Sequence, residues 1–251
     1  MIDTRIAERR AAVRDEGRRR RLRRTIGLVV VVALVTAVVL VERSDLVGLE
    51  EIEVVGTNRL DAETIREAAD LALGTSTLRL RLGRVEERVE TLPLVASARA
   101  QRVDPLTVRI EVVEREPALV AVGDQGPVLL DRDGLVLVAG DLDGLPRIDV
   151  RGAAPQPGDS AAVDPGLANA VRAWRGLSGP LRARVTRFEA HGPDELTLHL
   201  DSGVEVRFGR AERVDEKVRA LGAVLGDIGD TVVAIIDVRA PSAPVVIGGP
   251  G

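Results

Sequence analysis

The sequence contains no cysteine and very few aromatic residues, and both absences limit what the protein can be. Without thiols it has no disulfides, no cysteine nucleophile and no cysteine-based zinc site. Trp174, Phe188 and Phe208 carry its only aromatic rings, so a hydrophobic core must consist mainly of valine, leucine, isoleucine and alanine. Lys217 is the single lysine among 35 basic residues, and this preference for arginine indicates a GC-rich bacterial genome.

Charge is distributed unevenly along the chain. The net charge is −4, yet residues 1–24 contain ten arginines and four acids, a local charge of +6 that leaves −10 for the rest. A basic tail can bind nucleic acid. This tail, however, runs directly into Ile26–Val41, sixteen residues without a charge. Arginines before an apolar helix follow the positive-inside rule, so we interpret residues 1–24 as a cytoplasmic tail.

The apolar run predicts a transmembrane helix over residues 25–43. At ~1.5 Å per residue the run is about 24 Å long, and the stems of Arg23 and Arg24 extend it toward a ~30 Å hydrocarbon core. A cleaved signal peptide would need small residues after the run, whereas Val39–Arg43 reads Val-Leu-Val-Glu-Arg. A buried core helix is seldom apolar on every face. We therefore expect an uncleaved single-pass anchor with the remaining chain outside the cytoplasm.

Residues 49–117 predict a small βααββ domain. The first strand has Ile52 and Val54 alternating with glutamates, the period of a half-buried strand. One helix begins after Asp61, and a second helix ends at Pro93. Two strands follow, of which the second alternates apolar and polar residues from Leu106 onward. Together these elements indicate a three-stranded sheet with two helices on one face.

Residues 118–240 predict a mainly antiparallel β domain with flanking helices, which makes the whole chain α+β. A helix begins at Asp164-Pro165, and another extends from Val214 to Leu225. In a hairpin around 201–203, His199 lies opposite Glu205 on the solvent face. The remaining expected strands are Leu119–Val122, Val128–Leu130, Leu135–Val138, Val185–Phe188 and, last, Val232–Arg239.

Patterns that carry chemistry are absent from the sequence. No G-x-S-x-G or S-x-x-K motif places a serine beside a base. Asp131 and Asp133 have the spacing of a calcium loop but lack its closing glutamate, and they precede a glycine where a turn is expected. We interpret His199 as one half of a cross-strand polar pair. A carboxylate pair for acid–base chemistry stays open, but we expect no enzyme, no metal and no cofactor.

Three stretches carry a resemblance to a known family. The first is Ile52-Glu-Val-Val-Gly-Thr-Asn-Arg-Leu, and the second is Val103-Asp-Pro-Leu-Thr-Val-Arg-Ile-Glu-Val-Val-Glu-Arg-Glu-Pro. The third is Gly203-Val-Glu-Val-Arg-Phe-Gly-Arg, followed by the helix with Lys217 and then Ile235-Ile-Asp-Val-Arg. Together with the anchor, they resemble the FtsQ/DivIB family of bacterial cell-division proteins, which combine a POTRA domain with a β domain.

The resemblance implies a scaffold of the cell-division machinery without enzyme activity. Its implied partners are small single-pass proteins of the FtsB/DivIC and FtsL type and, directly or indirectly, a septal peptidoglycan synthase of the FtsW/FtsI type. Its implied location is the plasma membrane at the division septum. Two other functions compete with this one: an anchored extracytoplasmic enzyme of cell-wall metabolism, and a POTRA adaptor for protein export.

The resemblance also implies that an exposed terminal strand receives the partner. We expect Val232–Arg239 to be that strand, because no later strand is predicted, and an edge strand offers unpaired N–H and C=O groups. Family members often have an aromatic residue nearby, and this chain has none. The alternative is that residues 240–251 form a frayed tail that binds nothing. In the domain assignment, residues 241–251 are a flexible C-terminal tail. The expected contacts are Ile236, Val238 and Arg239, with the adjoining Ala240, Pro241, Ser242, Ala243, Pro244, Val245 and Val246.

Overall fold

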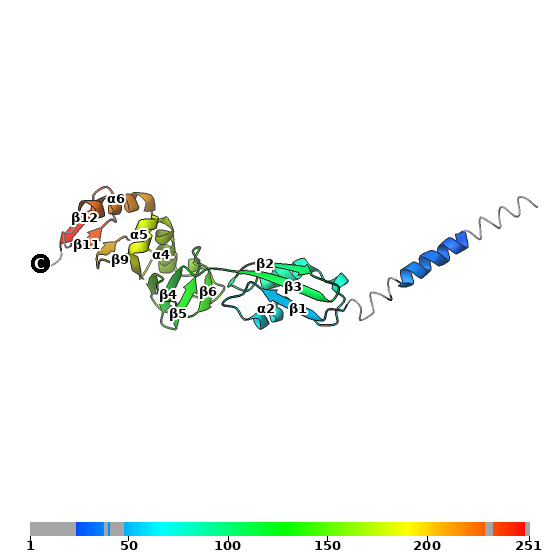
Figure 1. Ribbon diagram of the computed structural model, residues 1–251. Coiled ribbons are helices and arrows are strands. Elements are labelled where there is room, and N and C mark those ends of the chain that lie inside the picture. The colour runs from blue at the N-terminus through cyan, green and yellow to red at the C-terminus, as the bar shows by residue number, and fades with distance from the viewer. Residues whose placement is uncertain (1–23, 38–39, 41–47, 229–232, 249–251) are drawn as a thin grey trace, which may run out of the picture.

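The computed structural model describes residues 24–37, 40, 48–228 and 233–248. A helix formed by residues 24–37, a three-stranded sheet and a nine-stranded sheet follow one another along the chain (Figure 1). Both sheets carry helices, which confirms the α+β class. The cytoplasmic-tail prediction for 1–24 falls almost entirely outside the described residues.

The first helix has apolar side chains on every face, and its described residues are exposed. Leu28 and Leu34 are 64% and 61% exposed, and no other part of the described chain covers them. Within the described ranges, no helix is both long enough and apolar enough to cross a bilayer. Residues 38–39 and 41–43 of the predicted span lie outside the described residues.

The first sheet has the predicted βααββ order. Strand β1 (Glu51–Val55) pairs parallel with β3 (Thr107–Glu114), and β3 pairs antiparallel with β2 (Val95–Arg102). Helices α2 (Ala62–Ala69) and α3 (Leu82–Val89) lie between β1 and β2 in the chain. Their apolar faces pack on one face of the sheet, so this small domain has its own core, formed by Leu49, Ile65, Ala69, Val85, Val89, Val95, Ala100, Val108, Ile110 and Val112.

The second sheet has nine strands in the order β12-β11-β10-β9-β8-β7-β4-β5-β6. Five of its neighbouring pairs are antiparallel and three are parallel, which agrees with the prediction of a mainly antiparallel sheet. The strands are β4 (Leu119–Gly123), β5 (Gly126–Leu130), β6 (Val136–Ala139), β7 (Arg147–Val150), β8 (Val185–Ala190), β9 (Leu196–Leu200), β10 (Glu205–Arg207), β11 (Val233–Asp237) and β12 (Val245–Gly248).

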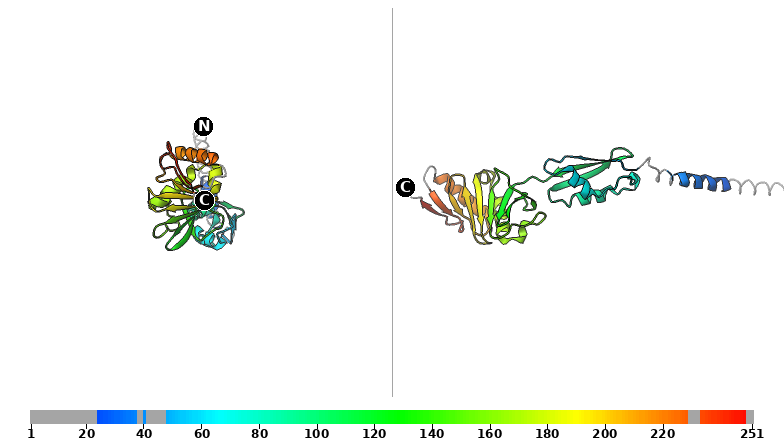
Figure 2. Two further views of the ribbon diagram at one scale, coloured as in Figure 1. Left: turned by 90° about the vertical axis from the view of Figure 1, so that its left-hand side faces the viewer. Right: turned by 90° about the horizontal axis from the view of Figure 1, so that it is seen from below.

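Helices cover one face of this sheet. Helix α4 (Pro165–Gly176) packs on β7, β8 and β9, and α6 (Val214–Asp227) packs beside α4 (Figure 2). The short α5 (Gly179–Arg184) precedes β8. Trp174, Phe188 and Phe208 all lie in the core between helices and sheet, where they are at most 7% exposed. The few aromatic rings of the chain therefore support this single core.

The two sheets are connected by residues 115–118. Arg115 N–H donates to the Leu94 carbonyl of the first domain at 2.7 Å. The guanidinium of Arg115 reaches toward the second domain, where its Nη1 lies 3.6 Å from Oδ2 of the buried Asp131. Asp131 also accepts the N–H groups of Asp133 and Leu135, so the turn-forming role predicted for this aspartate is confirmed.

The C-terminal end differs from the prediction. Val232–Arg239 was expected to be the last strand, at the edge of its sheet, and this is wrong: β11 lies between β10 and β12. A turn closed by the Ala243 N–H and the Ala240 carbonyl at 3.0 Å leads from β11 into β12. The flexible tail predicted for 241–251 is therefore wrong for 245–248, and 249–251 lie outside the described residues.

Residues 245–248 form a strand because of their local sequence. Val245, Val246 and Ile247 are consecutive β-branched residues, which favour strands. Pro241 and Pro244 precede them and shape the turn, whereas the prediction placed both prolines in a flexible tail over 241–251. The missed strand is short, and only its pairing with β11 makes it stable.

Candidate functional site

Strand β12 is one edge of the nine-stranded sheet, and β6, whose Val136 bonds to Gly158 and Asp159, is the other. All four residues of β12 are exposed, and Val245, Val246 and Ile247 are 55%, 42% and 44% exposed. Edge strands expose unpaired backbone groups, and natural proteins usually protect them with charges or proline. This edge carries three apolar side chains instead. It is therefore the strongest candidate in the described chain for a surface that another chain covers.

The hydrogen-bonding direction of β12 follows from that of β11. Val238 N–H donates to the Arg207 carbonyl of β10 at 3.0 Å, so the backbone groups of Val238 point toward β10. Because this direction alternates along a strand, the groups of Asp237 point toward β12. Asp237 lies opposite Val245, and these two residues form a hydrogen-bonded pair. The next residue, Val246, therefore directs its N–H and C=O outward, away from the sheet.

Pro244 limits the usable edge. By the same alternation its carbonyl also points outward, but proline has no N–H to donate. Gly248, two residues after Val246, also directs its N–H and C=O outward by this alternation. A strand added to this edge can therefore form a full hydrogen-bonded pair at Val246 and continue at Gly248, but it can only donate to Pro244.

The side chains of β12 project to both faces of the sheet. Val246 lies opposite Ile236, whose side chain is fully buried in the core, so Val246 extends the helix-covered face. Val245 lies opposite Asp237 and Ile247 opposite Ile235, so these two extend the open face. A bound strand would meet apolar side chains on both of its faces.

The predicted contact residues separate into two groups. Ile236 and Val238 are 0% exposed and belong to the core, so they are not available to a partner. Arg239 is exposed, and its Nη2 lies 2.6 Å from Asp237 Oδ2. This guanidinium is the main reason that the pKa of Asp237 lies below its ordinary value.

The other predicted contact residues, 240–246, belong to the hairpin that joins β11 to β12. Ala240, Pro241, Ser242 and Ala243 make the turn, and Pro244 leads into Val245 and Val246 of β12. Ile247 and Gly248 also belong to this edge and were not among the predicted contacts. Their signal was the uninterrupted β-branched run that ends at Ile247.

A buried amide supports the base of this hairpin. The Asn169 side chain of α4 donates to the Gly209 carbonyl at 3.1 Å and accepts the Ala211 N–H at 2.5 Å. Gly209 has a φ of 67°, and a Cβ built there would lie 3.0 Å from Cγ of Arg239. The stem of Arg239 therefore packs closely on the segment that Asn169 holds. The exit of β11 is positioned by this contact.

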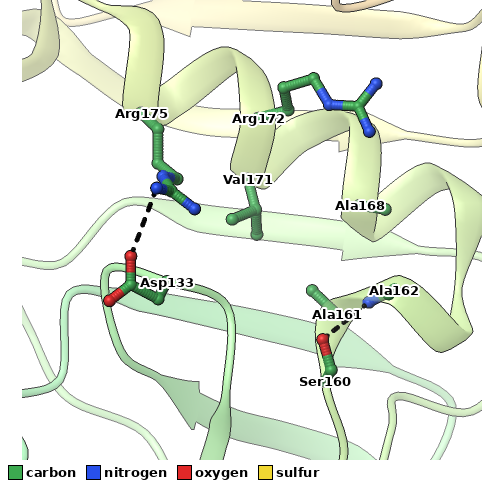
Figure 3. Close-up of a pocket in the computed structure, with 8 residues that line it drawn as sticks. All are labelled: Asp133, Ser160, Ala161, Ala162, Ala168, Val171, Arg172 and Arg175. Atoms are coloured by element: carbon green, nitrogen blue, oxygen red, sulfur yellow. Dashed lines mark hydrogen bonds and ion pairs between the residues drawn. The ribbon is translucent and has the colours of Figure 1, made fainter.

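The cavities of the described chain are shallow. One, of about 280 Å³, lies between α4 and the turn after β5 (Figure 3). Arg175 reaches across it, with its Nη2 3.5 Å from Asp133 Oδ1, and the Ser160 hydroxyl accepts the Ala162 N–H at 3.3 Å. No histidine lines it, and its one carboxylate, Asp133, is the group that faces Arg175.

The next question is whether the described residues offer a metal site or a reactive histidine. Within the described residues, no group of three or more histidine, aspartate or glutamate side chains is arranged so that it could hold a metal ion. His199 lies opposite Glu205, as predicted. Its Nε2 is 3.1 Å from Oε1 of Glu189, on the neighbouring strand β8. The histidine is thus part of a polar network on the open face of the sheet.

Comparison with known proteins gives a consistent result over almost the whole described chain. The model for the POTRA domain of FtsQ type matches residues 47–115, and the model for the C-terminal part of cell division protein FtsQ/DivIB matches 118–239. Proteins named cell division protein FtsQ are 32% identical over 225 residues in Mycobacteroides abscessus and 35% identical over 202 residues in Mycolicibacterium smegmatis.

These matches cover 88% and 80% of this chain, and they span 69% and 57% of the two mycobacterial proteins. A protein of the same name from Streptomyces collinus is 28% identical over 238 residues, which is 90% of this chain and 89% of that protein. The two family models adjoin in the same order as the two sheets. The chain belongs to the FtsQ/DivIB family of cell-division proteins.

Proposed function

We propose that this protein is a membrane-anchored, non-enzymatic scaffold of the division septum that receives an extended segment of a partner along β12. The observation that carries the proposal is the edge itself: Val246 directs an N–H and a C=O outward, between exposed apolar side chains. Strand addition satisfies such backbone groups, and the alternate side chains provide specificity. Family membership supports the role in cell division.

The partners proposed for this edge are small single-pass proteins of the FtsB/DivIC type, together with those of the FtsL type. A septal peptidoglycan synthase of the FtsW/FtsI type would join directly or through them. The proposed contacts are now Arg239 and residues 240–248. The two units proposed to carry this function are residues 49–117 and 118–240, the second extended to include β12.

The anchor proposal rests on the first helix. From Ile26 to Val41 the chain has no charged side chain, and it follows a segment with ten arginines. The described part of this run is helical, with apolar side chains exposed on all faces. In water such a surface is unfavourable by ~25 cal/mol for each Å² of apolar area, and a bilayer removes that cost. We propose that residues 25–43 span the membrane with residues 1–24 in the cytoplasm.

The proposed strand addition is tested by replacing Val246 with proline. This change removes the outward N–H but none of the bonds to β11, and proline is tolerated on an edge strand where its N–H side faces solvent. Val246→Ala is the matched control, because it shortens the side chain and keeps the N–H. Binding is measured with the extracytoplasmic segment of the bacterium's own FtsB/DivIC-type protein.

We expect Val246→Pro to weaken this binding at least tenfold and Val246→Ala to weaken it less. Thermal unfolding shows whether each variant is folded. A folded Val246→Pro protein that binds as tightly as wild type would place the partner elsewhere. Val245→Pro, which removes an inward N–H, should instead lower the stability of the hairpin.

A further inference from the structure

Residues 71–84 of the first domain differ in charge from the chain around them. This segment contains three arginines, five leucines and no acid, whereas residues 25–251 together carry a charge of −10. Leu73 and Leu78 are 66% and 57% exposed. Arg81 and Arg84, later in the same segment, are exposed as well. The segment therefore combines exposed leucines with cations in an otherwise acidic region.

The fold places this segment next to the point where the chain enters the first domain. Gly48 forms a β-bridge with Ser76, and Leu49 N–H donates to the Thr75 carbonyl at 2.9 Å. Gly74 N–H donates to the Leu49 carbonyl at 2.7 Å. Only residues 41–47 separate Gly48 from the helical residue 40, and a chain of that length spans roughly 30 Å at most.

Hydrogen bonds hold the segment in one conformation. The guanidinium of Arg102 on β2 donates to the Thr77 and Leu80 carbonyls at 2.6 and 2.7 Å. The hydroxyl of the buried Thr77 donates to the Pro105 carbonyl at 2.7 Å. The exposed leucines are thus presented on a fixed loop, so binding a surface would order little additional chain.

We propose that residues 71–84 lie against the surface of an anionic bilayer, with Leu73 and Leu78 in the interfacial region and Arg81 and Arg84 beside lipid phosphates. This inference rests on the proposed membrane anchor. Arginines near an anionic surface and apolar side chains at the headgroup boundary both favour such contact. A lipid surface fits better than a protein partner because the connection to the anchor is short and the segment has no acidic side chain.

The test uses the absence of cysteine from the chain. Leu73→Cys, Leu78→Cys and, as a control, Val163→Cys are each labelled with a nitroxide in the full-length protein. Val163 is 64% exposed and lies in the second domain. The proteins are reconstituted into nanodiscs of phosphatidylcholine, with or without phosphatidylglycerol. Accessibility to oxygen and to a water-soluble nickel complex then reports whether each label lies in lipid or in water.

We expect labels at 73 and 78 to gain oxygen accessibility and lose nickel accessibility in phosphatidylglycerol nanodiscs, while the label at 163 stays in water. The double variant Arg81→Gln/Arg84→Gln loses two cations that attract the anionic lipid. Its ratio of lipid-facing to water-facing labels should fall about fivefold for each arginine removed. Labels at both positions that stay in water, in a protein that resists alkaline extraction, would overturn the lipid contact alone. Extraction of the wild-type protein would overturn the anchor as well.

Discussion

The Nζ atom of Lys217 lies 2.8 Å from the carbonyl oxygen of Phe208, and its ammonium group stands 5.0 Å from the centre of the Phe208 ring. The same nitrogen donates to the Arg210 carbonyl at 2.7 Å. Lys217 is only 5% exposed, and this burial lowers the pKa of its ammonium group. The single lysine of the chain therefore ties α6 to the end of β10.

Lys217→Met should destabilise the second domain, because it leaves the Phe208 carbonyl in buried surroundings without a donor, whereas the Arg210 carbonyl keeps the Glu212 N–H at 2.8 Å. One unsatisfied buried carbonyl costs roughly 1–3 kcal/mol. The free energy of unfolding is measured by urea denaturation. Arg219→Met, at an exposed position of the same helix, is the control and should change it by less than ~0.5 kcal/mol. Equal stabilities for the two variants would show that the Lys217 contacts contribute nothing.

Glu114 gives the first domain a dependence on acid pH. Burial opposes ionisation of this carboxyl, but the N–H groups of Leu60, Asn58 and Arg59 stabilise its charged form, and together they hold the pKa of Glu114 below its ordinary value. The three nitrogens lie 2.8–2.9 Å from Oε1 of Glu114. The carboxylate therefore fixes the loop between β1 and α2.

Because the folded-state pKa of Glu114 is lower than the unfolded-state pKa, its contribution to stability is complete above the unfolded-state pKa and is lost as the pH falls through the folded-state pKa. Glu114→Gln should reduce stability by about 1–2 kcal/mol at neutral pH and should show a flatter decline in acid. Unfolding curves measured between neutral and acid pH check this. Parallel acid limbs for wild type and variant would mean that another carboxyl is responsible.

The proposed topology predicts which side chains are reached from outside the cell. In an otherwise cysteine-free chain, Ser202→Cys should react with a membrane-impermeant maleimide in intact cells, because Ser202 is an exposed turn residue of the second domain. Ala12→Cys, in the arginine-rich segment, should react only after lysis. The reverse pattern would place the two ends of the chain on the opposite sides.

The features predicted correctly are those that depend on residues close together in the sequence. The hairpin of β9 and β10 has the predicted register, since a tight turn and alternating leucines determine which residues lie opposite each other. Asp164 accepts the Leu167 N–H at 2.7 Å at the start of α4, as its Asp-Pro pair predicted. The βααββ order of the first domain was predictable for the same reason.

Only the tertiary structure decided which strand forms the edge. Strand β7, four residues long and not predicted, lies between β4 and β8, both of which it pairs with in parallel. Strand β12 depends in the same way on β11, and without that partner its residues resemble a tail. Such short strands have too little local preference to be recognised alone, because their stability comes from hydrogen bonds and packing with residues distant in sequence. The composition and the local patterns of this chain determine its fold class and family and are the basis of the proposed anchor, whereas the position of the exposed edge strand depends on these distant pairings.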